Sequence, residues 1–163
     1  MPYFDEAVET LSREDLAALQ FAKLKAMLEE LWEKNDFYTA KWRAAGVAPD
    51  DIKSLDDLTK LPVTLKSELV EDQEANPPYG TNLTYPLKDY VRFHQTSGTT
   101  GKPLKVLDTE ASWSWWGTCW AHVLAGAGVT AEDKIFLAFG FGPFVGFWAS
   151  VEGARQIGAT MIP

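Results

Sequence analysis

The spacing of apolar residues changes at one turn-rich segment, NPPYGTNLTYP at residues 76–86. Before this segment, leucines recur at the three- and four-residue intervals of amphipathic helices. After it, short apolar runs alternate with longer helical stretches, which is the pattern of a sheet with crossover helices. Because asparagine, proline and glycine at this density favour turns, we interpret the segment as a linker. The change of spacing across this linker predicts a helical lobe over residues 1–78 and an α/β domain over residues 79–163.

The N-terminal lobe carries clear helix start signals. Ser12 and Asp15 form a capping box in front of a leucine-rich helix that we expect to end near Glu33. A second helix is predicted from Asp36, and a further one over residues 65–71.

Strands and helices alternate in the second half of the chain. We expect strands at residues 90–95, 104–107, 134–139 and 159–162, with helices over 109–127 and 145–156. Since strand-helix-strand units imply parallel neighbours, the predicted fold class is α/β: a helical N-terminal lobe and the first part of a mainly parallel sheet with flanking helices. One helical face is expected to pack against that sheet through Trp113, Trp116 and Trp120.

Composition excludes several function classes. With 15 basic and 23 acidic residues the formal net charge is −8, which argues against a nucleic-acid partner. Cys119 is the only cysteine, so no internal disulfide is expected and a cytoplasmic location is favoured. Neither a signal peptide nor a run of about 18 apolar residues is present, so no membrane association is expected. No metal site is predicted, since Cys119 and His122 have no third ligand at useful spacing.

The stretch HQTSGTTGKPLKV, from residue 94, does not fit two common phosphate-binding patterns. Gly98 and Gly101 are separated by two residues, whereas a Walker A loop needs four. The nearest dinucleotide fingerprint, at Gly140, Gly142 and Gly146, has one residue too many before its last glycine.

The residue types of this stretch nevertheless suit a polyphosphate. Hydroxyls donate to phosphate oxygens, glycines let the backbone approach an anion, and a lysine adds positive charge. A flexible hairpin loop is the alternative, because such loops are often rich in these residues. The candidate nucleotide-binding residues are Thr96, Ser97, Gly98, Thr99, Thr100, Gly101 and Lys102.

The string TSGTTGKP, at residues 96–103, resembles the phosphate loop of the adenylate-forming superfamily. Further segments resemble the phenylacetate-CoA ligase family within it: YFDEAVETLSREDLAALQ, FYTAKWRAAGVAPDDIKSLDDLTKLPVTLKSEL, FGFGPFVGF and GATMIP. The resemblance extends over residues 3–163 and implies an incomplete N-terminal domain of an adenylate-forming ligase.

This resemblance implies an ATP-dependent reaction in two steps. An aromatic carboxylate attacks the α-phosphorus of ATP, pyrophosphate leaves, and the thiol of CoA then displaces AMP to give a thioester. ATP, Mg²⁺ and CoA are therefore the implied cofactors. By resemblance, the β- and γ-phosphates of Mg²⁺-ATP contact Ser97, Thr99, Thr100 and Lys102, and the two loop glycines permit the close approach.

The resemblance also implies a pocket for the aromatic acid. Phe139 and Phe144 would face the substrate ring, and Gly142 would leave it room. Phe139 stands where the family often has tyrosine, so a more apolar or simply different acid is expected; burial in the core is the alternative for this aromatic run. His94 would contact substrate or phosphate, or serve as an ordinary hydrogen-bonded strand residue.

Later motifs of the family do not occur in these 163 residues: the aromatic-Gly-x-Thr-Glu segment, the ribose-binding aspartate and the mobile domain with its catalytic lysine. We therefore assign no catalytic residue, interpret the chain as the N-terminal fragment of a longer ligase, and expect it to be inactive by itself.

Two alternative functions stay open. The first is a relative that adenylylates its substrate and passes it to a carrier protein, an amine or a deazaflavin. The second is a non-catalytic nucleotide-binding or interaction module, which would form a homodimer through the sheet edge exposed at Ile162.

Overall fold

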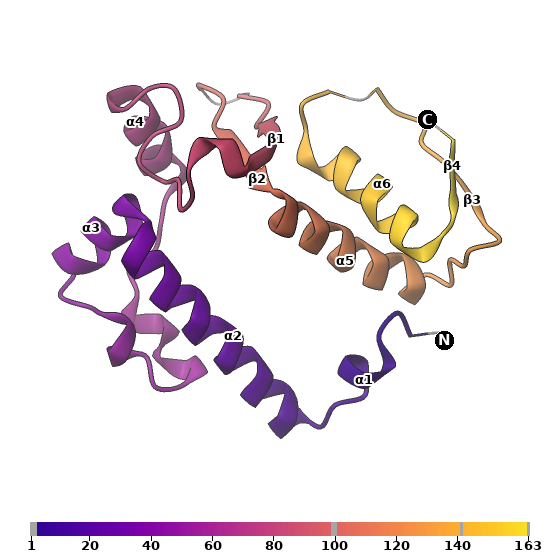
Figure 1. Cartoon of the computed structure of the whole chain (residues 1–163), viewed down its shortest axis with the longest axis horizontal. Coiled ribbons are helices and arrows are strands. Elements are labelled where there is room, and N and C mark those ends of the chain that lie inside the picture. The colour runs from indigo at the N-terminus through magenta and orange to yellow at the C-terminus, as the bar shows by residue number, and fades with distance from the viewer. Residues whose placement is uncertain (1–2, 99–100, 141, 163) are drawn as a thin grey trace. The chain divides into compact units, whose positions relative to one another are not determined.

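The computed structural model describes residues 3–98, 101–140 and 142–162. Its elements (Figure 1) are, in order, α1 (Glu6–Glu9), α2 (Arg13–Lys34), α3 (Asp36–Ala44), the 3-10 helices η1 (Pro49–Asp51) and η2 (Leu55–Lys60), α4 (Lys66–Ala75), η3 (Leu87–Asp89), β1 (Tyr90–Gln95), β2 (Lys105–Thr109), α5 (Glu110–Gly126), β3 (Lys134–Phe136), α6 (Val145–Ile157) and β4 (Thr160–Ile162). None of the helices in the described ranges has the length and apolar character needed to cross a membrane.

The described residues form two compact units. One contains residues 11–87, and the other combines residues 3–10 with the described part of 88–163. We call them the helical unit and the loop unit. The domain boundary expected between residues 78 and 79 stays a prediction.

The helical unit begins as its sequence predicts. The Ser12 hydroxyl accepts a hydrogen bond from the Asp15 amide at 3.0 Å and caps α2. Its core consists of Leu28, Trp42 and Ile52, which come from α2, α3 and the residue after η1. Apolar side chains spaced along the two helices thus meet where the helices turn back on each other. Their burial provides most of the driving force for folding of this unit.

A buried asparagine ties the turn-rich segment to this unit. Asn35 caps α3 and is only 2% exposed. Its Nδ2 donates to Asn82 Oδ1 at 3.1 Å and to Thr84 Oγ1 at 3.0 Å, and its Oδ1 accepts from the Tyr38 amide at 3.0 Å. Residues 76–86, which we interpreted as a linker, are therefore held against the helix corner by side-chain hydrogen bonds.

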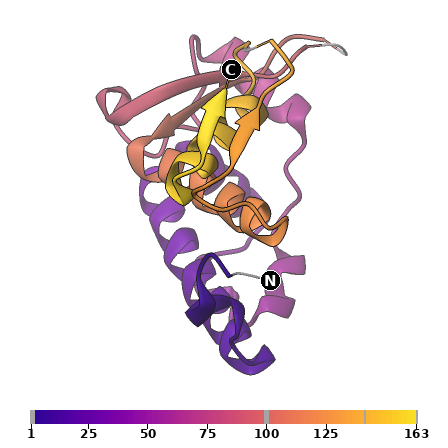
Figure 2. The same cartoon turned by 90° about the vertical axis from the view of Figure 1, so that its right-hand side faces the viewer.

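The strands of the loop unit form two separate pairs. β1 and β2 are antiparallel, whereas β3 and β4 are parallel (Figure 2). Nine residues join β1 to β2, too few for the crossover that a parallel pair needs, so these strands are antiparallel. Helix α6 provides such a crossover between β3 and β4, which are therefore able to pair in parallel. The mixed helix-strand class is confirmed, but the described strands make two pairs where one mainly parallel sheet was expected.

Helices α5 and α6 lie side by side and approach each other closely (Figure 1). A Cβ atom added at Gly153 would lie 2.4 Å from Trp120 Cβ, and one added at Gly117 would lie 2.5 Å from Glu152 Cγ. Glycine at both positions therefore sets the helix separation.

The expected face of Trp113, Trp116 and Trp120 is wrong in part. Trp113 is 4% exposed and Trp116 is 42% exposed. The buried row of α5 is Trp113, Gly117, Ala121 and Ala125. Gly117 and Ala121 of this row lie where α6 approaches, and Trp116 lies outside the row.

Replacing Asn35 with alanine should destabilise the helical unit. The change leaves the oxygen acceptors of Asn82 and Thr84 without their amide donor in a buried site, so we expect the free energy of unfolding to fall by about 2 kcal/mol. Urea denaturation measures the change. Gln20→Ala, at an exposed position of α2, is the control and should be nearly neutral. Equal stability of the two variants would contradict the role given to Asn35.

The Asp57 carboxylate should give the helical unit a defined acid sensitivity. Its pKa is lowered to about 2, chiefly by a hydrogen bond from Lys60 Nζ and then by the Lys53 amide. A lowered folded-state pKa stabilises the fold above the ordinary value near 3.8, and this contribution is lost as the pH falls toward 2. Carboxyl ¹³C titration should return a pKa near 2, whereas a value near 3.8 would show that these contacts do not persist in solution.

Candidate functional site

The predicted phosphate loop is closed at its base by two hydrogen bonds. The Thr96 amide donates to the Leu104 carbonyl at 3.0 Å, and the Leu104 amide donates to Thr96 Oγ1 at 2.9 Å. The hydroxyl oxygen of Thr96 therefore accepts a hydrogen bond within the protein. These bonds extend the β1–β2 hairpin by one step and bring the two ends of the loop together.

Both glycines of the loop have backbone conformations that other residues rarely adopt. Gly98 has φ +68°, and a Cβ atom there would lie 2.9 Å from both the Gly101 carbonyl oxygen and Pro103 Cγ. Gly101 has φ +152°, and its amide donates to the Gly98 carbonyl at 3.0 Å. The glycines are therefore required by the backbone path of the loop itself.

The remaining residues of the loop stand as follows. Ser97 and Lys102 are exposed at the surface, where a nucleotide could reach them. Thr99 and Thr100 lie outside the described residues.

The three residues predicted for the acid pocket surround one glycine-rich turn. A Cβ atom at Gly142 would lie 2.8 Å from the ring of Phe144, so this ring occupies the space beside the glycine. Phe139 stacks on Phe147 with ring centroids 4.2 Å apart, and Phe144 meets Phe147 edge-on at 6.1 Å. Phe147 thus completes a group of three aromatic rings at the start of α6.

The loop and the turn lie next to each other, although some forty residues separate them in sequence. The Gln95 amide, one residue before the loop, donates to the Pro143 carbonyl at 2.9 Å. The indole N–H of Trp148 donates to the adjacent Gly142 carbonyl, also at 2.9 Å. The candidate nucleotide site and the candidate acid site therefore share one backbone connection.

His94 lies in the packed interior beside α5. It is 3% exposed, and its ring stacks on Trp113 with centroids 5.1 Å apart. Its Nδ1 is 3.3 Å from Asp108 Oδ2, yet the two groups make no hydrogen bond, and within the described ranges neither atom has another partner. Asp108 Oδ1 accepts from the Ser112 hydroxyl at 3.0 Å. A role of His94 toward substrate or phosphate stays a prediction.

Several residues at this site were missed by sequence reasoning. Arg92 places its guanidinium carbon 4.9 Å from the Trp113 ring centroid and 5.8 Å from that of Trp148. Phe147 follows Phe144 at helical spacing, a signal that the helix predicted over residues 145–156 already contained. No sequence pattern marks the contacts of Arg92 and Trp148, because they join three elements.

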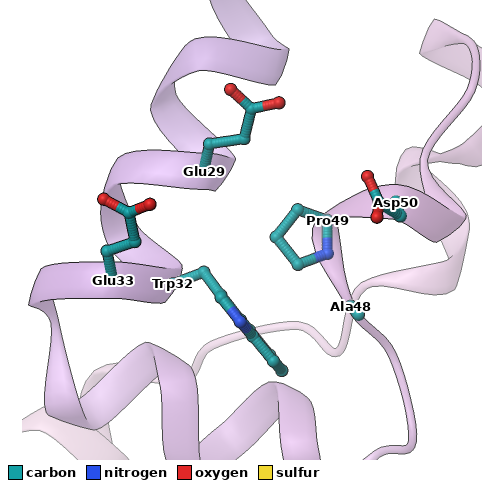
Figure 3. A pocket seen from close by; sticks show the side chains of 6 residues that line it. All are labelled: Glu29, Trp32, Glu33, Ala48, Pro49 and Asp50. Carbon is teal, nitrogen blue, oxygen red and sulfur yellow. The ribbon is translucent and has the colours of Figure 1, made fainter.

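The helical unit contains a separate hollow of about 190 Å³ between α2 and η1 (Figure 3). Glu29, Trp32 and Glu33 line it from α2, and Pro49 and Asp50 line it from η1. Three carboxylates would repel a triphosphate, so we do not assign nucleotide binding to this hollow.

The loop has the chemistry of an anion site that relies on donors and on one lysine. Among the described residues, no group of three His, Cys, Asp or Glu side chains is placed to hold a metal ion.

Comparisons by sequence identify related proteins. No family model matches the chain. The chain is 40% identical over 158 residues to the phenylacetate-coenzyme A ligase of Escherichia coli (strain K12), covering 97% of this chain and 35% of that protein. Identity to the phenylacetate-coenzyme A ligase of Aromatoleum evansii is 37% over the same shares. The chain thus spans about a third of the length of the curated relatives it matches.

Solved structures of a CoA ligase share the fold. A crystal structure of 2-hydroxyisobutyryl-CoA ligase in the postadenylation state, in complex with 2-HIB-AMP, superposes with a TM-score of 0.91 at 29% identity, covering 99% of this chain and 34% of that one. An open conformation of the same ligase, with 2-HIB-AMP and CoA, gives the same TM-score of 0.91 and covers 99% of this chain and 37% of that one.

Replacing Gly98 with alanine should disturb the loop. A side chain at φ +68° costs about 1 kcal/mol, and the clash with Pro103 adds to it, so we expect the free energy of unfolding to fall by about 1 to 3 kcal/mol. Gly126→Ala in α5 is the matched control, because its Cβ would meet open space and alanine favours helices. Thermal or urea unfolding compares the two, and a Gly98→Ala protein as stable as the control would refute the constraint.

Proposed function

Because the chain belongs to the phenylacetate-CoA ligase family and matches the N-terminal portion of its members, we propose that it supplies the phosphate loop and the acid-facing turn of an ATP-dependent acyl-CoA ligase. In the proposed reaction, a carboxylate oxygen attacks the α-phosphorus of ATP and the bond to pyrophosphate breaks. The thiol of CoA then attacks the acyl carbon, and AMP leaves as the thioester forms.

One observation carries the proposal: the loop that suits a phosphate and the aromatic turn are joined by the hydrogen bond from Gln95 to Pro143. The reaction needs a triphosphate and a carboxylate held side by side, because their mutual repulsion opposes the encounter. A backbone bond between the two sites supports such an arrangement.

The loop residues would act on the leaving group. As pyrophosphate departs, negative charge builds up on its oxygens, and Lys102 together with the hydroxyls of Ser97, Thr99 and Thr100 would donate to them. Mg²⁺ bound to the nucleotide would disperse the same charge. Gly98 and Gly101 would let the backbone approach the phosphates without side-chain interference.

An aromatic carboxylic acid is the proposed substrate class. The names of the relatives and the aromatic group of Phe139, Phe144 and Phe147 both support an aromatic ring here. Ring-on-ring contacts add attraction beyond the burial of apolar area. His94 is proposed as a nearby contact from β1.

CoA is the proposed acceptor. The relatives and the solved structures described above are named CoA ligases, and one of those structures contains both an acyl-AMP and CoA. This favours CoA over a carrier protein, an amine or a deazaflavin.

Calorimetric titration of the 163-residue chain with Mg²⁺-ATP tests the loop. The wild-type chain should bind, and Lys102→Ala should weaken binding by about tenfold, since a charge-assisted contact to phosphate is lost. Lys134→Ala, which removes an exposed lysine at the start of β3, is the control with the same change of charge. It should leave the dissociation constant unchanged within about twofold.

The outcomes separate clearly. Equal weakening by both lysine variants would mean that net charge alone attracts the nucleotide, and absence of binding by the wild type would refute a preformed loop. No AMP should accumulate when an aromatic acid is added, because the catalytic lysine segment of the family does not occur in these residues.

A further inference from the structure

Two neighbouring carbonyls of the glycine-rich turn each accept a hydrogen bond, one from a residue earlier in the sequence and one from a residue later in it. The Gly142 carbonyl accepts from the indole N–H of Trp148 on α6, and the Pro143 carbonyl accepts from the amide of Gln95 on β1, each at 2.9 Å. Two adjacent peptide groups with fixed acceptors leave the turn little freedom to shift. The position of the Phe144 ring beside Gly142 is set by the same turn.

One arginine connects the donors of these two bonds. Arg92 lies on β1, and its guanidinium is close to the rings of Trp113 on α5 and Trp148 on α6, at 4.9 Å and 5.8 Å. A cation over an indole face is attracted by the ring electrons, and arginine also stacks well on flat rings. Arg92 therefore holds the strand that enters the phosphate loop against both helices.

The charge of Arg92 also acts on α6. The pKa of Glu152 is lowered, first by the hydrogen bond from Arg155 and to a smaller extent by the charge of Arg92. Glu152, whose carboxylate pairs with Arg155, lies on the helix whose first turn carries Phe147 and Trp148. None of these contacts belongs to the loop or to the three aromatic rings themselves.

We propose that Arg92 and Trp148 are positioning residues, which hold the Gly142–Pro143 turn against the strand feeding the phosphate loop and so couple acid binding to nucleotide binding. The inference rests on the proposed function for the identity of the two ligands, but the anchoring of the turn can be tested without any ligand. Neither residue is assigned a contact with substrate.

The first test measures amide hydrogen exchange by NMR in the ligand-free chain. Trp148→Phe keeps an aromatic ring and removes the N–H donor, so the turn should loosen and the Gln95 amide should exchange about tenfold faster. Arg92→Leu keeps that donor and should raise the same rate by a smaller factor, about threefold. Trp116→Phe, a matched change at an exposed position of α5, should leave the rate within about twofold of wild type.

These rates decide the anchoring claim. A Gln95 exchange rate in Trp148→Phe within about twofold of wild type would overturn it. If Trp148→Phe fails to fold, Arg92→Leu decides in its place, and an unchanged rate there would equally refute the proposal. If the double variant exchanges no faster than Trp148→Phe alone, Arg92 acts through the indole, as proposed.

The second test measures coupling between the ligands by calorimetry. Phenylacetate is titrated into the chain with and without a non-hydrolysable ATP analogue and Mg²⁺, and we expect about a fivefold difference between its two dissociation constants. In Trp148→Phe this ratio should fall toward one, whereas binding of the analogue by itself should change by less than about twofold. Substitution of a residue with a purely structural role would weaken the binding of both ligands and leave the ratio of the two phenylacetate dissociation constants unchanged.

The two tests separate the possible failures. If the wild-type chain binds neither ligand, the proposed function fails for this chain, and the exchange rates still decide whether Arg92 and Trp148 anchor the turn. If both ligands bind to the wild type but the ATP analogue leaves the dissociation constant of phenylacetate unchanged, the coupling claim is overturned while the proposed function stands.

Discussion

The close approach of α5 and α6 is the constraint on which the loop unit depends. Gly153 leaves no space for a Cβ atom, because the backbone of α5 at Trp120 and Ala121 approaches it, and at Gly117 the side chains of Glu152 and Gln156 fill the space beside the glycine. The separation of the two helices decides where Trp113 and Trp148 lie, because each of these side chains comes from one of the two helices. The guanidinium of Arg92 meets both indole rings. Helix packing therefore sets the position of the hairpin strand that leads into the predicted phosphate loop.

A second consequence is that the candidate site is assembled from contacts that lie outside it. The loop supplies hydroxyls, amides and a lysine, and the turn supplies aromatic rings. Their relative placement, however, comes from the backbone bond of Gln95 and the indole bond of Trp148. Hydrogen bonds to buried or partly buried carbonyls are directional, and losing one leaves an acceptor without a partner. The geometry between the candidate anion site and the candidate aromatic site thus depends on residues that need not touch a ligand.

Local signals in the sequence predicted the elements well. Ser12 and Thr109 cap α2 and α5, and Tyr90–Gln95 is the strand that its alternating pattern indicated. Side-chain burial was harder to predict. The exposed Trp116 and the aromatic contact of Phe147 both depend on which face of a helix meets its neighbour. Periodicity shows that a helix has faces, but it does not identify the partner that covers each one.

The sequence by itself determined the residue types of the predicted phosphate loop, the helix caps, the helix-strand order and the similarity to phenylacetate-CoA ligases, because each of these depends on neighbours within a few positions or on matched strings. Tertiary structure alone decided that the strands form two pairs, that the turn-rich segment packs against Asn35, and that Arg92 joins three elements. The physical reason is that packing and hydrogen bonding between distant segments depend on shape and distance in space, and no local pattern of residues records these.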